Sequence, residues 1–294
     1  MSEPHSTPTS MPGSPPPSPE PVRRALVLTH GRAATIGPAL ERVQATADAA
    51  GVELLYPDEE RVKHGLPPDG DDSAAADLAV VLGGDGTMLR ALGRFLDARV
   101  PVVGVNYGRV GFLTAIPAER LEEDLSRVLA GEYRTVELST LDVVVGGQAR
   151  TAVNDVVVAG GTLGRMIEVG YAIGDEQLGS QPCDGLICAT PTGSTAYNLS
   201  NGGPVLVWGL DAMVLTFVAP HSLHIRPLVV PRGPDVTMTN LTADIDVTVL
   251  VDGQQVGALA TGESATVRVG RMPSLLATLP EVTFFSRYAA TFGR

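Results

Sequence analysis

The sequence predicts an α/β domain with a parallel sheet, followed by an all-β sandwich domain. Up to about residue 133, apolar runs typical of buried strands alternate with helical patterns. After Tyr133, short β-rich runs are separated by Gly, Pro, Asn and Asp. The chain of 294 residues is long enough to bury two cores. We therefore expect two folded domains rather than one.

The first 21 residues, MSEPHSTPTSMPGSPPPSPEP, are rich in Pro and Ser and contain almost no large apolar side chains. Such a segment cannot bury a core, so we expect residues 1–21 to be a disordered tail. The α/β domain is then expected over 22–133.

Strands and helices alternate in this first domain. Helices are predicted over 35–50 and 87–98, where apolar residues recur at helical spacing, and over 117–131, which has Pro in its first turn and Gly at its end. The segment 57–73 is acidic and rich in Pro and Gly, so we expect a mobile loop. Strands that alternate with helices imply right-handed crossovers and a parallel sheet covered on both faces. The predicted strands are RALVLTH, VELLY, LAVVL and VPVVGV.

The second domain is expected over 134–271, where short β-rich runs follow one another. Strands with this turn punctuation are typical of a sandwich, and Asp252-Gly253 in VDGQQV is a strong hairpin signal. Ligands of parallel sheets bind beyond the carboxyl ends of the strands. His30, the Gly83–Thr87 turn and Asn106 are expected at such ends.

The charge of the chain limits its partners. The formal net charge is -12 and the sequence pI is about 4.8. Nucleic acid and anionic membranes bind through clustered positive charge, so neither is expected as a partner. The single lysine, Lys63, lies in the predicted loop. A P-loop needs a lysine directly after its glycines, so the chain cannot contain one.

The two cysteines, Cys183 and Cys188, do not have the spacing of a zinc site. So few cysteines in a chain of this length are consistent with a reducing compartment. The N-terminus lacks the pattern of a signal peptide, and no run of 18 apolar residues occurs. We therefore expect a cytoplasmic enzyme.

The turn LGGDGT, Leu82–Thr87, follows the apolar run DLAVV. Its glycines let the backbone approach a ligand closely, and the helix that starts near Thr87 offers N–H groups to phosphate oxygens. A carboxylate beside phosphates is unfavourable unless it holds a metal ion or takes a proton from an attacking hydroxyl. Asp85 is a candidate for either role. The alternative is that Asp85 caps the helix.

Two further stretches are rich in polar groups. The segment 183–206, CDGLICATPTGSTAYNLSNGGPVL, offers many hydroxyl and backbone N–H donors, which suit a polyhydroxylated ligand. It is alternatively a long structural crossing between the domains. In VNDVVV, Asn154 and Asp155 begin an apolar strand. An amide and a carboxylate at a domain interface could bind a base edge or ribose hydroxyls, and the alternative is a strand-start turn.

The segments GGDGT, NDVVV and DGLICATPTGSTAYNLSNGGP, in this order and spacing, resemble the NAD kinase family. GVNYGRVGFLTAI (104–116) and PHSLHIRPLVV (220–230) resemble further segments of that family, so that the resemblance covers essentially residues 23–290. GGDG by itself is shared with diacylglycerol-type lipid kinases and phosphofructokinases. GSTAY together with the Asn-acid pair is much more specific.

The resemblance implies a fold and an activity. The fold is a Rossmann-like α/β domain of the NAD kinase and diacylglycerol kinase type plus a β-sandwich, with the site in the cleft and 272–294 returning to the first domain. The activity is phosphorylation of the adenosine ribose 2′-hydroxyl of NAD, giving NADP. The donor is ATP with a divalent metal, Mg²⁺ by preference, or polyphosphate. The resemblance also implies a homodimer or homotetramer.

The resemblance implies site residues by motif position. Asp85 is the general base, Gly86 and Arg90 contact the dinucleotide, and Phe112 borders a base pocket. Asn154 and Asp155 hold nucleotide hydroxyls. Further substrate contacts are Arg165, Asp184, Thr195, Ala196, Tyr197, Asn198, Leu199, Ser200, Ala219 and Gln254, and the phosphate contacts are Gly83, Gly84, Gly86 and Thr87.

The sequence departs from the family pattern at two places. QPC, before Asp184, is neutral where some relatives carry a basic residue, which leaves the choice between NAD and NADH open. Asp155 stands where many members have Glu. Two other functions stay open from the residues: a lipid or sugar kinase that shares the GGDG turn, and a non-catalytic nucleotide sensor.

Overall fold

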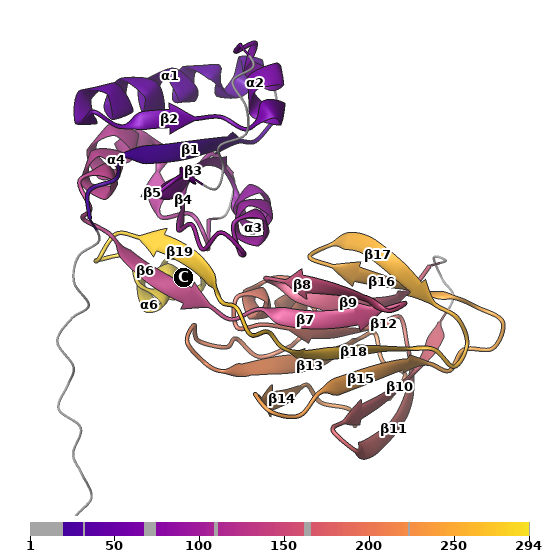
Figure 1. Cartoon of the computed structure of the whole chain (residues 1–294). Coiled ribbons are helices and arrows are strands. Elements are labelled where there is room, and N and C mark those ends of the chain that lie inside the picture. The colour runs from indigo at the N-terminus through magenta and orange to yellow at the C-terminus, as the bar shows by residue number, and fades with distance from the viewer. Residues whose placement is uncertain are drawn as a thin grey trace, which may run out of the picture.

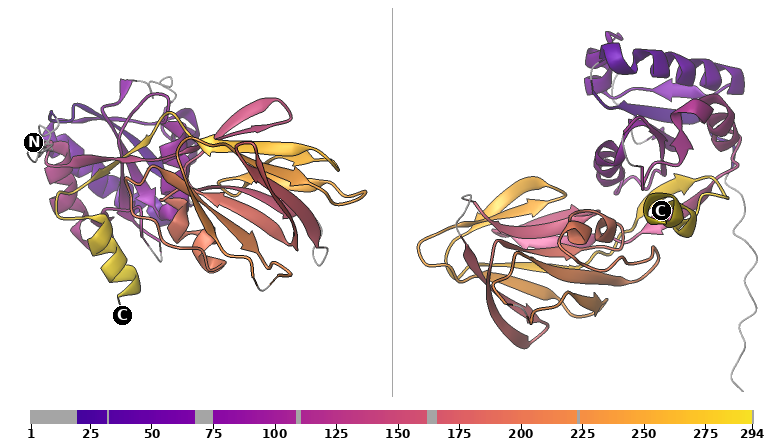
Figure 2. Two further views of the ribbon diagram at one scale, coloured as in Figure 1. Left: turned by 90° about the horizontal axis from the view of Figure 1, so that it is seen from below. Right: turned by 180° about the vertical axis from the view of Figure 1, so that it is seen from behind.

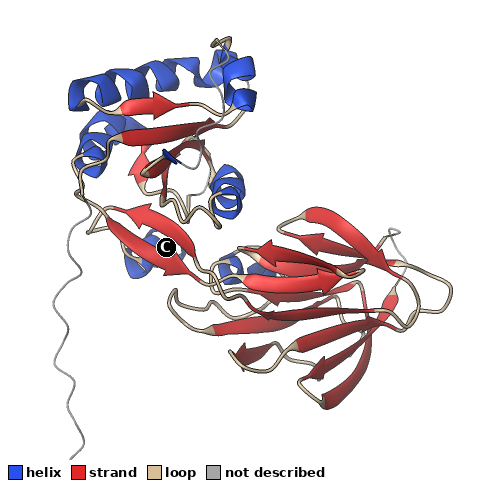
Figure 3. Cartoon of the chain, in the orientation of Figure 1, coloured by secondary structure: helices blue, strands red, loops and turns tan. Residues whose placement is uncertain are grey.

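The computed structural model describes residues 20–31, 33–67, 75–108, 111–161, 166–222 and 224–293. Within these residues the strands form three sheets of seven, six and six strands. Helices gather around the seven-stranded sheet, whereas the other part of the molecule consists almost entirely of strands (Figures 1 and 3). The α/β part and the β-sandwich predicted from the sequence are therefore both confirmed.

The first sheet has a parallel centre. Its strands lie in the order β2, β1, β3, β4, β19, β6, and the two-residue β5 pairs with β4. β1 to β4 are parallel because helices connect them, as the alternation predicted. The first strands are β1 (Arg24–Thr29), β2 (Glu53–Leu55), β3 (Leu78–Gly83), β4 (Val102–Asn106) and β5 (Ile116–Pro117).

Helices cover both faces of this sheet. α1 (Ala33–Ala50) and α4 (Leu121–Leu129), the latter after the 3-10 turn η2 (Ala118–Arg120), pack on one face. α3 (Asp85–Arg94) packs on the other face through Met88 and Leu92. The β3 residues are apolar throughout because they are buried on both sides.

The segment 57–73, predicted as a mobile loop, contains a helix. α2 (Asp58–His64) begins with three acidic residues and ends at Gly65, which has a left-handed φ of 67°. The loop prediction was wrong for 58–64 because Pro and acidic residues at a helix start resemble loop composition. Residues 68–74 lie outside the described residues.

The chain returns to the first sheet after the sandwich. β19 (Ser274–Thr278) is parallel to β4 and antiparallel to β6 (Arg134–Leu138), so the sheet extends five residues beyond 133. α6 (Phe284–Phe292) follows, and a capping box between Thr283 and Ser286 fixes its start. Figure 1 shows α6 beside β6 and β19.

The sandwich consists of two antiparallel sheets that enclose one apolar core (Figure 2). Buried and more exposed residues alternate along several of its strands, such as β7, β15 and β16. One sheet has the order β11 (Glu176–Cys183), β10 (Ile167–Ile173), β15 (Val236–Asn240), β18 (Ser264–Val269), β7 (Leu141–Val145) and β8 (Gln148–Ala152). The other has β14 (Leu228–Pro231), β13 (Ala212–Val218), β12 (Gly185–Ala189), β9 (Asp155–Gly160), β16 (Val247–Val251) and β17 (Gln254–Leu259).

The two parts share a core at their junction. Val153, just before β9, belongs to the same apolar cluster as Leu92 of α3 and Leu113, and Trp208 packs against it. Ser274 of β19 also donates a hydrogen bond to the Leu92 carbonyl at 2.9 Å. The segments that carry the predicted motifs are therefore fixed relative to one another by buried contacts. Within the described ranges, no helix is both long and apolar enough to cross a membrane.

Candidate active site

Asp85 is the first residue of α3, and Gly84 occupies the N-cap position. The Asp85 side chain accepts its hydrogen bonds from Phe112 and Leu113 rather than from the first turn of α3. The alternative in which Asp85 caps the helix is therefore wrong.

The Asp85 carboxylate is instead held by the loop that follows β4. Its Oδ2 accepts the N–H of Phe112 at 2.8 Å, and its Oδ1 accepts the N–H of Leu113 at 2.9 Å. Burial raises the pKa of Asp85, and these backbone N–H groups and the charge of Arg287 oppose that rise. Asp85 is thus a partly buried carboxylate in a fixed orientation.

The glycines of the turn allow close packing around Asp85. A Cβ on Gly83 would lie 2.7 Å from Thr87 Oγ1, and one on Gly84 would lie 3.3 Å from Gly108 Cα. Gly86 has nothing within 4 Å of such a Cβ and is exposed. The first two glycines therefore serve the turn itself, and Gly86 leaves backbone open to a ligand.

The Asn154 segment and the Thr190–Ser200 segment lie together. The N–H of Thr190 donates to the Asn154 carbonyl at 2.8 Å, and Thr190 Oγ1 donates to the Val153 carbonyl at 2.7 Å. A Cβ on Gly193 would lie 2.1 Å from the Asn154 carbonyl oxygen. The fold thus joins two motifs that are nearly forty residues apart in sequence.

Asp252 organises the same place. Its carboxylate accepts the N–H groups of Val153 at 2.9 Å, Asn154 at 2.7 Å and Asp155 at 3.1 Å. The sequence marked Asp252-Gly253 only as a hairpin turn, and its left-handed φ of 50° agrees with a turn. Nothing in the local pattern distinguished a turn aspartate from one that binds three distant N–H groups.

Of the two carboxylates at this place, Asp155 is buried and Asp252 is partly buried. Burial, with the charge of Asp252 added to it, raises the pKa of Asp155 to about 7. Burial also raises the pKa of Asp252, against the three N–H groups that it accepts. The Asn154 side-chain oxygen is buried and has no hydrogen-bond partner among the described residues. A buried acceptor without a partner is costly, and a ligand hydroxyl would satisfy it.

The run Thr195–Ser200, in the turn η3 (Gly193–Thr195) and the short helix α5 (Tyr197–Ser200), divides into two kinds of residue. Asn198 is fully buried, and its side chain bonds Ser194, Pro204 and Thr216. It therefore supports the loop from inside. Tyr197 is 46% exposed and Ser200 is also exposed, so these two can face a ligand.

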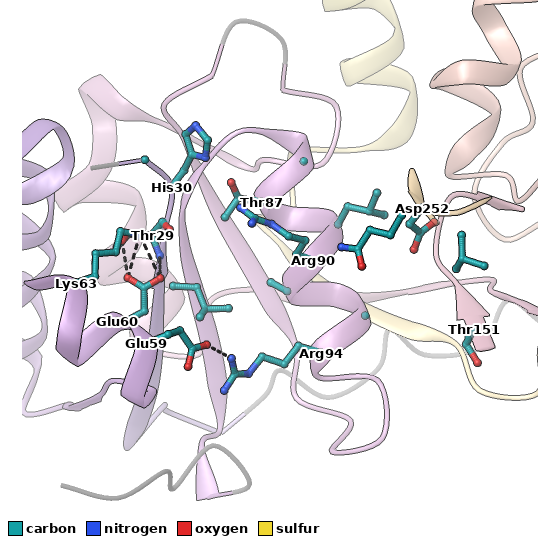
Figure 4. Close-up of a pocket in the computed structure, with 18 of the residues that line it drawn as sticks. Thr29, His30, Glu59, Glu60, Lys63, Thr87, Arg90, Arg94, Thr151 and Asp252 are labelled. Atoms are coloured by element: carbon teal, nitrogen blue, oxygen red, sulfur yellow. Dashed lines mark hydrogen bonds and ion pairs between the residues drawn. The ribbon is translucent and has the colours of Figure 1, made fainter. Parts of the chain in front are cut away.

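A cleft of about 1050 Å³ lies between the two parts of the molecule (Figure 4). Residues of β1, α2 and α3 line one side, and Asp252, Thr151 and the start of β17 line the other. Of the predicted site residues, the cleft lining includes Gly86, Thr87, Arg90 and Gln254. Asp85 and Asn154 are not in the lining, but each adjoins a lining residue: Asp85 precedes Gly86 in the chain, and the N–H of Asn154 donates to Asp252.

The α2 side of this cleft carries a polar cluster that the sequence did not predict. Glu60, which is 5% exposed, accepts the N–H and the hydroxyl of Thr29 at 3.1 and 2.6 Å. Lys63 donates to the Thr29 carbonyl at 2.6 Å, and His64 Nε2 lies 3.3 Å from Glu60. Figure 4 shows Lys63 and Glu60 of α2 beside Thr29, and Glu59 of the same helix joined to Arg94 of α3. The cluster was not predicted because Lys63, the single lysine, lies in a charged stretch that has the composition of a solvated surface loop.

The other predicted residues lie as follows. Phe112 is buried, and its ring packs edge-on against Trp208 and Phe284 at centroid distances of 5.7 and 5.5 Å. Asp184, between β11 and β12, and Ala219, after β13 with a φ of 45°, are both exposed and lie outside the cleft lining. Arg165 lies outside the described residues.

The resemblance implied a divalent metal ion, so the side chains that could bind one were located. In the parts of the chain that the structure describes, no group of three or more His, Cys, Asp or Glu side chains is placed to hold a metal ion. Mg²⁺ is usually held by one or two carboxylates together with substrate phosphates and water, rather than by a closed protein cage. Asp252, which lines the cleft, can supply such a carboxylate, so the residues fit a metal that enters with a phosphorylated ligand.

Comparisons with known proteins agree with this architecture. Residues 65–133 match the family model of the ATP-NAD kinase N-terminal domain, and residues 153–279 match that of its C-terminal domain. An NAD kinase from Heliobacterium modesticaldum is 44% identical over 71% of this chain and 76% of its own length. An NAD kinase from Moorella thermoacetica is 38% identical over 81% of this chain and 79% of its own.

Two solved structures have the same fold. The yeast NADH kinase complexed with NADH superimposes with a TM-score of 0.81 over 93% of this chain and 88% of that chain, at 21% identity. The NAD kinase from Archaeoglobus fulgidus in complex with ATP gives a TM-score of 0.73 over 92% and 97%, at 25% identity.

Proposed function

Because the chain belongs to the NAD kinase family, we propose that it is a phosphotransferase that moves the terminal phosphoryl group of ATP to the adenosine ribose 2′-hydroxyl of NAD, giving NADP. One observation carries the proposal most directly. Two backbone N–H groups, of Phe112 and Leu113, fix the Asp85 carboxylate directly before Gly86, which lines the interdomain cleft.

Asp85 is proposed as the general base. Each of its oxygens accepts one backbone N–H and keeps capacity for one more hydrogen bond, which a ribose hydroxyl can donate. The raised pKa makes it a stronger base than an exposed aspartate, and the N–H groups keep it oriented. Its role is to take the proton of the 2′-hydroxyl as that oxygen attacks the phosphoryl group.

The phosphate end of the donor is assigned to the cleft. The first turn of α3 presents Gly86 and Thr87 to the cleft, and a helix N-terminus favours anions. Lys63 of α2 and Arg90 of α3 supply positive charge to the cleft lining. A divalent metal, Mg²⁺ by preference, would enter with ATP and neutralise charge on the phosphoryl oxygens. Polyphosphate offers the same chemistry, so the donor assay includes it.

The acceptor is assigned to the segment that Asp252 holds. The unpaired Asn154 side-chain oxygen can accept a ribose hydroxyl, and Asp155 lies beside it. The exposed ring of Tyr197 is available to stack on a base. Arg90 and Gln254, which both line the cleft, are assigned to the dinucleotide phosphates. Arg165, Asp184 and Ala219 stay predictions from the resemblance alone.

The test is formation of NADP by the purified full-length protein, measured with an NADP-specific dehydrogenase. ATP and polyphosphate are compared as donors, and NAD and NADH as acceptors, each with and without Mg²⁺. We expect NADP from ATP and NAD. Absence of NADP under all conditions contradicts the proposal. If NAD then still raises the thermal midpoint, the protein is a nucleotide sensor.

We further propose that the enzyme is cytoplasmic and forms a homodimer or homotetramer. Cys183 and Cys188 are both buried and free, which supports a reducing compartment. Leu228 and Val229, on the edge strand β14, are 43% and 44% exposed, and exposed apolar side chains of this kind favour a subunit contact. Light scattering after size-exclusion chromatography decides the oligomeric state.

A further inference from the structure

Arg287 is a buried cation on α6 with no carboxylate bound to it among the described residues. The residue is 5% exposed. Its Nη1 donates to the carbonyls of Phe112 and, at 2.8 Å, Thr114, and its Nη2 donates to Thr278 Oγ1 at 3.1 Å. Its Nε is buried and has no partner within the described part of the chain. Burying a charge without a paired carboxylate is costly, so the position calls for an explanation.

The explanation lies in the peptide group between Phe112 and Leu113. Its carbonyl accepts the Arg287 guanidinium, and its N–H donates to Asp85 Oδ1. A cation at the oxygen of a peptide draws electrons away from the nitrogen, and chains of hydrogen bonds strengthen one another in this way. Arg287 therefore acts on Asp85 through one shared peptide.

The charge of Arg287 also favours the ionised form of Asp85, as the shared peptide does. The positive charge of Arg287 opposes the effect of burial on Asp85, and the negative charge of Asp85 in turn favours the protonated guanidinium. Burial and the like charge of Arg134, on β6, lower the pKa of Arg287 to about 10, so it stays charged at neutral pH. Besides Asp85 and Arg287 themselves, Arg134 is the charged side chain among the described residues that acts on Arg287.

Packing fixes the guanidinium in place. Its central carbon lies 5.3 Å from the centre of the Trp208 ring, and Trp208 in turn packs against Phe112 and Phe284. Phe284 is on α6, and Phe112 is in the loop that holds Asp85. The C-terminal helix and the Asp85 loop are thus locked together around Arg287.

We infer that Arg287 is a positioning residue for phosphoryl transfer, which orients the Asp85 carboxylate and keeps it ionised through the Phe112–Leu113 peptide. The inference rests on the proposed function, in which Asp85 is the base. If Arg287 had only a structural role, it would hold α6 against the loop that contains Phe112, and its loss would lower the stability of the protein without changing the pH dependence. The two roles differ in what they do to the pH dependence of turnover.

The experiment compares Arg287→Met, Arg287→Lys and the control Arg127→Gln in the full chain. Arg127 pairs with Glu281 on the exposed surface just before α6, so its loss perturbs the same region without reaching Asp85. NADP formation is measured from about pH 5 to 9 at saturating ATP and NAD. In parallel, hydrogen–deuterium exchange measures protection of the peptide that contains Phe112 and Leu113, without substrates.

For Arg287→Met we expect kcat to fall about 100-fold, since a displaced base has effects of that size. We also expect the acid limb of the pH profile to move about one unit upward, because the carboxylate loses a nearby positive charge. Arg287→Lys should keep the wild-type acid limb while kcat is reduced, because a lysine keeps the charge without the planar fork. Exchange at Phe112 and Leu113 should rise in Arg287→Met, and Arg127→Gln should resemble wild type in every measurement.

An acid limb that stays at its wild-type pH in Arg287→Met overturns the inference, and so does a kcat within twofold of wild type. If the wild-type protein forms no NADP, the proposed function fails and the exchange measurement decides: unchanged protection of Leu113 in Arg287→Met overturns the inference. If Arg287→Met does not fold, Arg287→Lys decides: a kcat within twofold of wild type together with unchanged protection of Leu113 overturns the inference.

Discussion

The carboxylate of Asp252, at the tip of the β16–β17 hairpin, accepts the backbone N–H of Asn154 at 2.7 Å. The same carboxylate accepts the N–H groups on either side of Asn154, so one turn residue fixes the backbone of the proposed acceptor site.

Asp252→Asn should therefore weaken the acceptor site. An amide group presents N–H toward three N–H donors, and each buried donor left without a partner costs about 1–3 kcal/mol. We expect kcat/KM for NAD to fall about 10- to 100-fold, together with a lower thermal midpoint. Asp244→Asn is the matched control, because Asp244 is an exposed turn residue whose φ of 56° also suits asparagine. Equal effects of the two substitutions on kcat/KM would contradict the role of Asp252.

Asp85→Asn should abolish most of the turnover while NAD still binds. The amide keeps the shape of the side chain but cannot take the hydroxyl proton, and loss of a general base typically costs about 10²–10⁴-fold. Turnover is measured by the NADP assay and NAD affinity by calorimetry. Asp97→Asn, on the exposed surface just after α3, serves as control. Near-normal turnover of Asp85→Asn shows that Asp85 is not the base.

Stability should fall as the pH rises from about 4 to about 7 in the absence of ligands. The pKa of Asp155 is raised to about 7 in the folded protein, so the folded state binds a proton that the unfolded state has already lost. Stability from that proton is complete below the unfolded pKa and is lost as the pH passes the folded one. Each pKa unit corresponds to about 1.4 kcal/mol, so the change is expected to be up to about 4 kcal/mol.

Urea unfolding at pH 5 and pH 8 measures this change, and Asp155→Asn should make the two values more nearly equal. The Asp85 and Asp252 carboxyls have pKa values raised in the same direction and add to the slope in both proteins. If the free energy of unfolding of Asp155→Asn changes with pH as steeply as that of the wild type, the proton that the folded state binds is not on Asp155.

Gly193→Ala should damage the acceptor site through the backbone. Its new Cβ would lie 2.1 Å from the Asn154 carbonyl oxygen and 2.5 Å from the carbonyl carbon, so the backbone must move. We expect KM for NAD to rise about tenfold or more, since misplacement by about 1 Å has effects of that size. In Gly37→Ala, on α1, nothing lies within 4 Å of the new Cβ, and activity should be unchanged. A wild-type KM in Gly193→Ala would exclude Asn154 from NAD binding.

Lys63→Met should raise KM for ATP by about 5- to 50-fold and leave KM for NAD within about twofold. The reason is that a cation on the cleft wall contributes to phosphate binding, where charge-assisted hydrogen bonds are each worth about 1.5–3 kcal/mol. Steady-state kinetics with each substrate varied in turn measures both constants. The reverse pattern, a changed KM for NAD only, would move the donor phosphates out of this part of the cleft.

The sequence by itself determined the two-part architecture and the location of Asp85. β1, β3 and β4 were predicted because a buried parallel strand is apolar on both faces. Such a strand gives a continuous run of apolar residues that is visible in the sequence. The GGDGT turn was visible because close backbone packing needs glycine at fixed local positions. Such signals act over a few residues and can be seen without the fold.

Only the tertiary structure decided how the side chains of the proposed site are arranged. Asp252 binds N–H groups nearly 100 residues away, Arg287 binds a carbonyl 175 residues away, and Lys63 of α2 lines the same cleft as Arg90 of α3. In sequence, each of these is one charged residue in a turn or an amphipathic stretch, which is how a solvated surface also looks. Their partners are set by which elements the two cores bring together, and that depends on burial summed over the whole chain rather than on any local pattern.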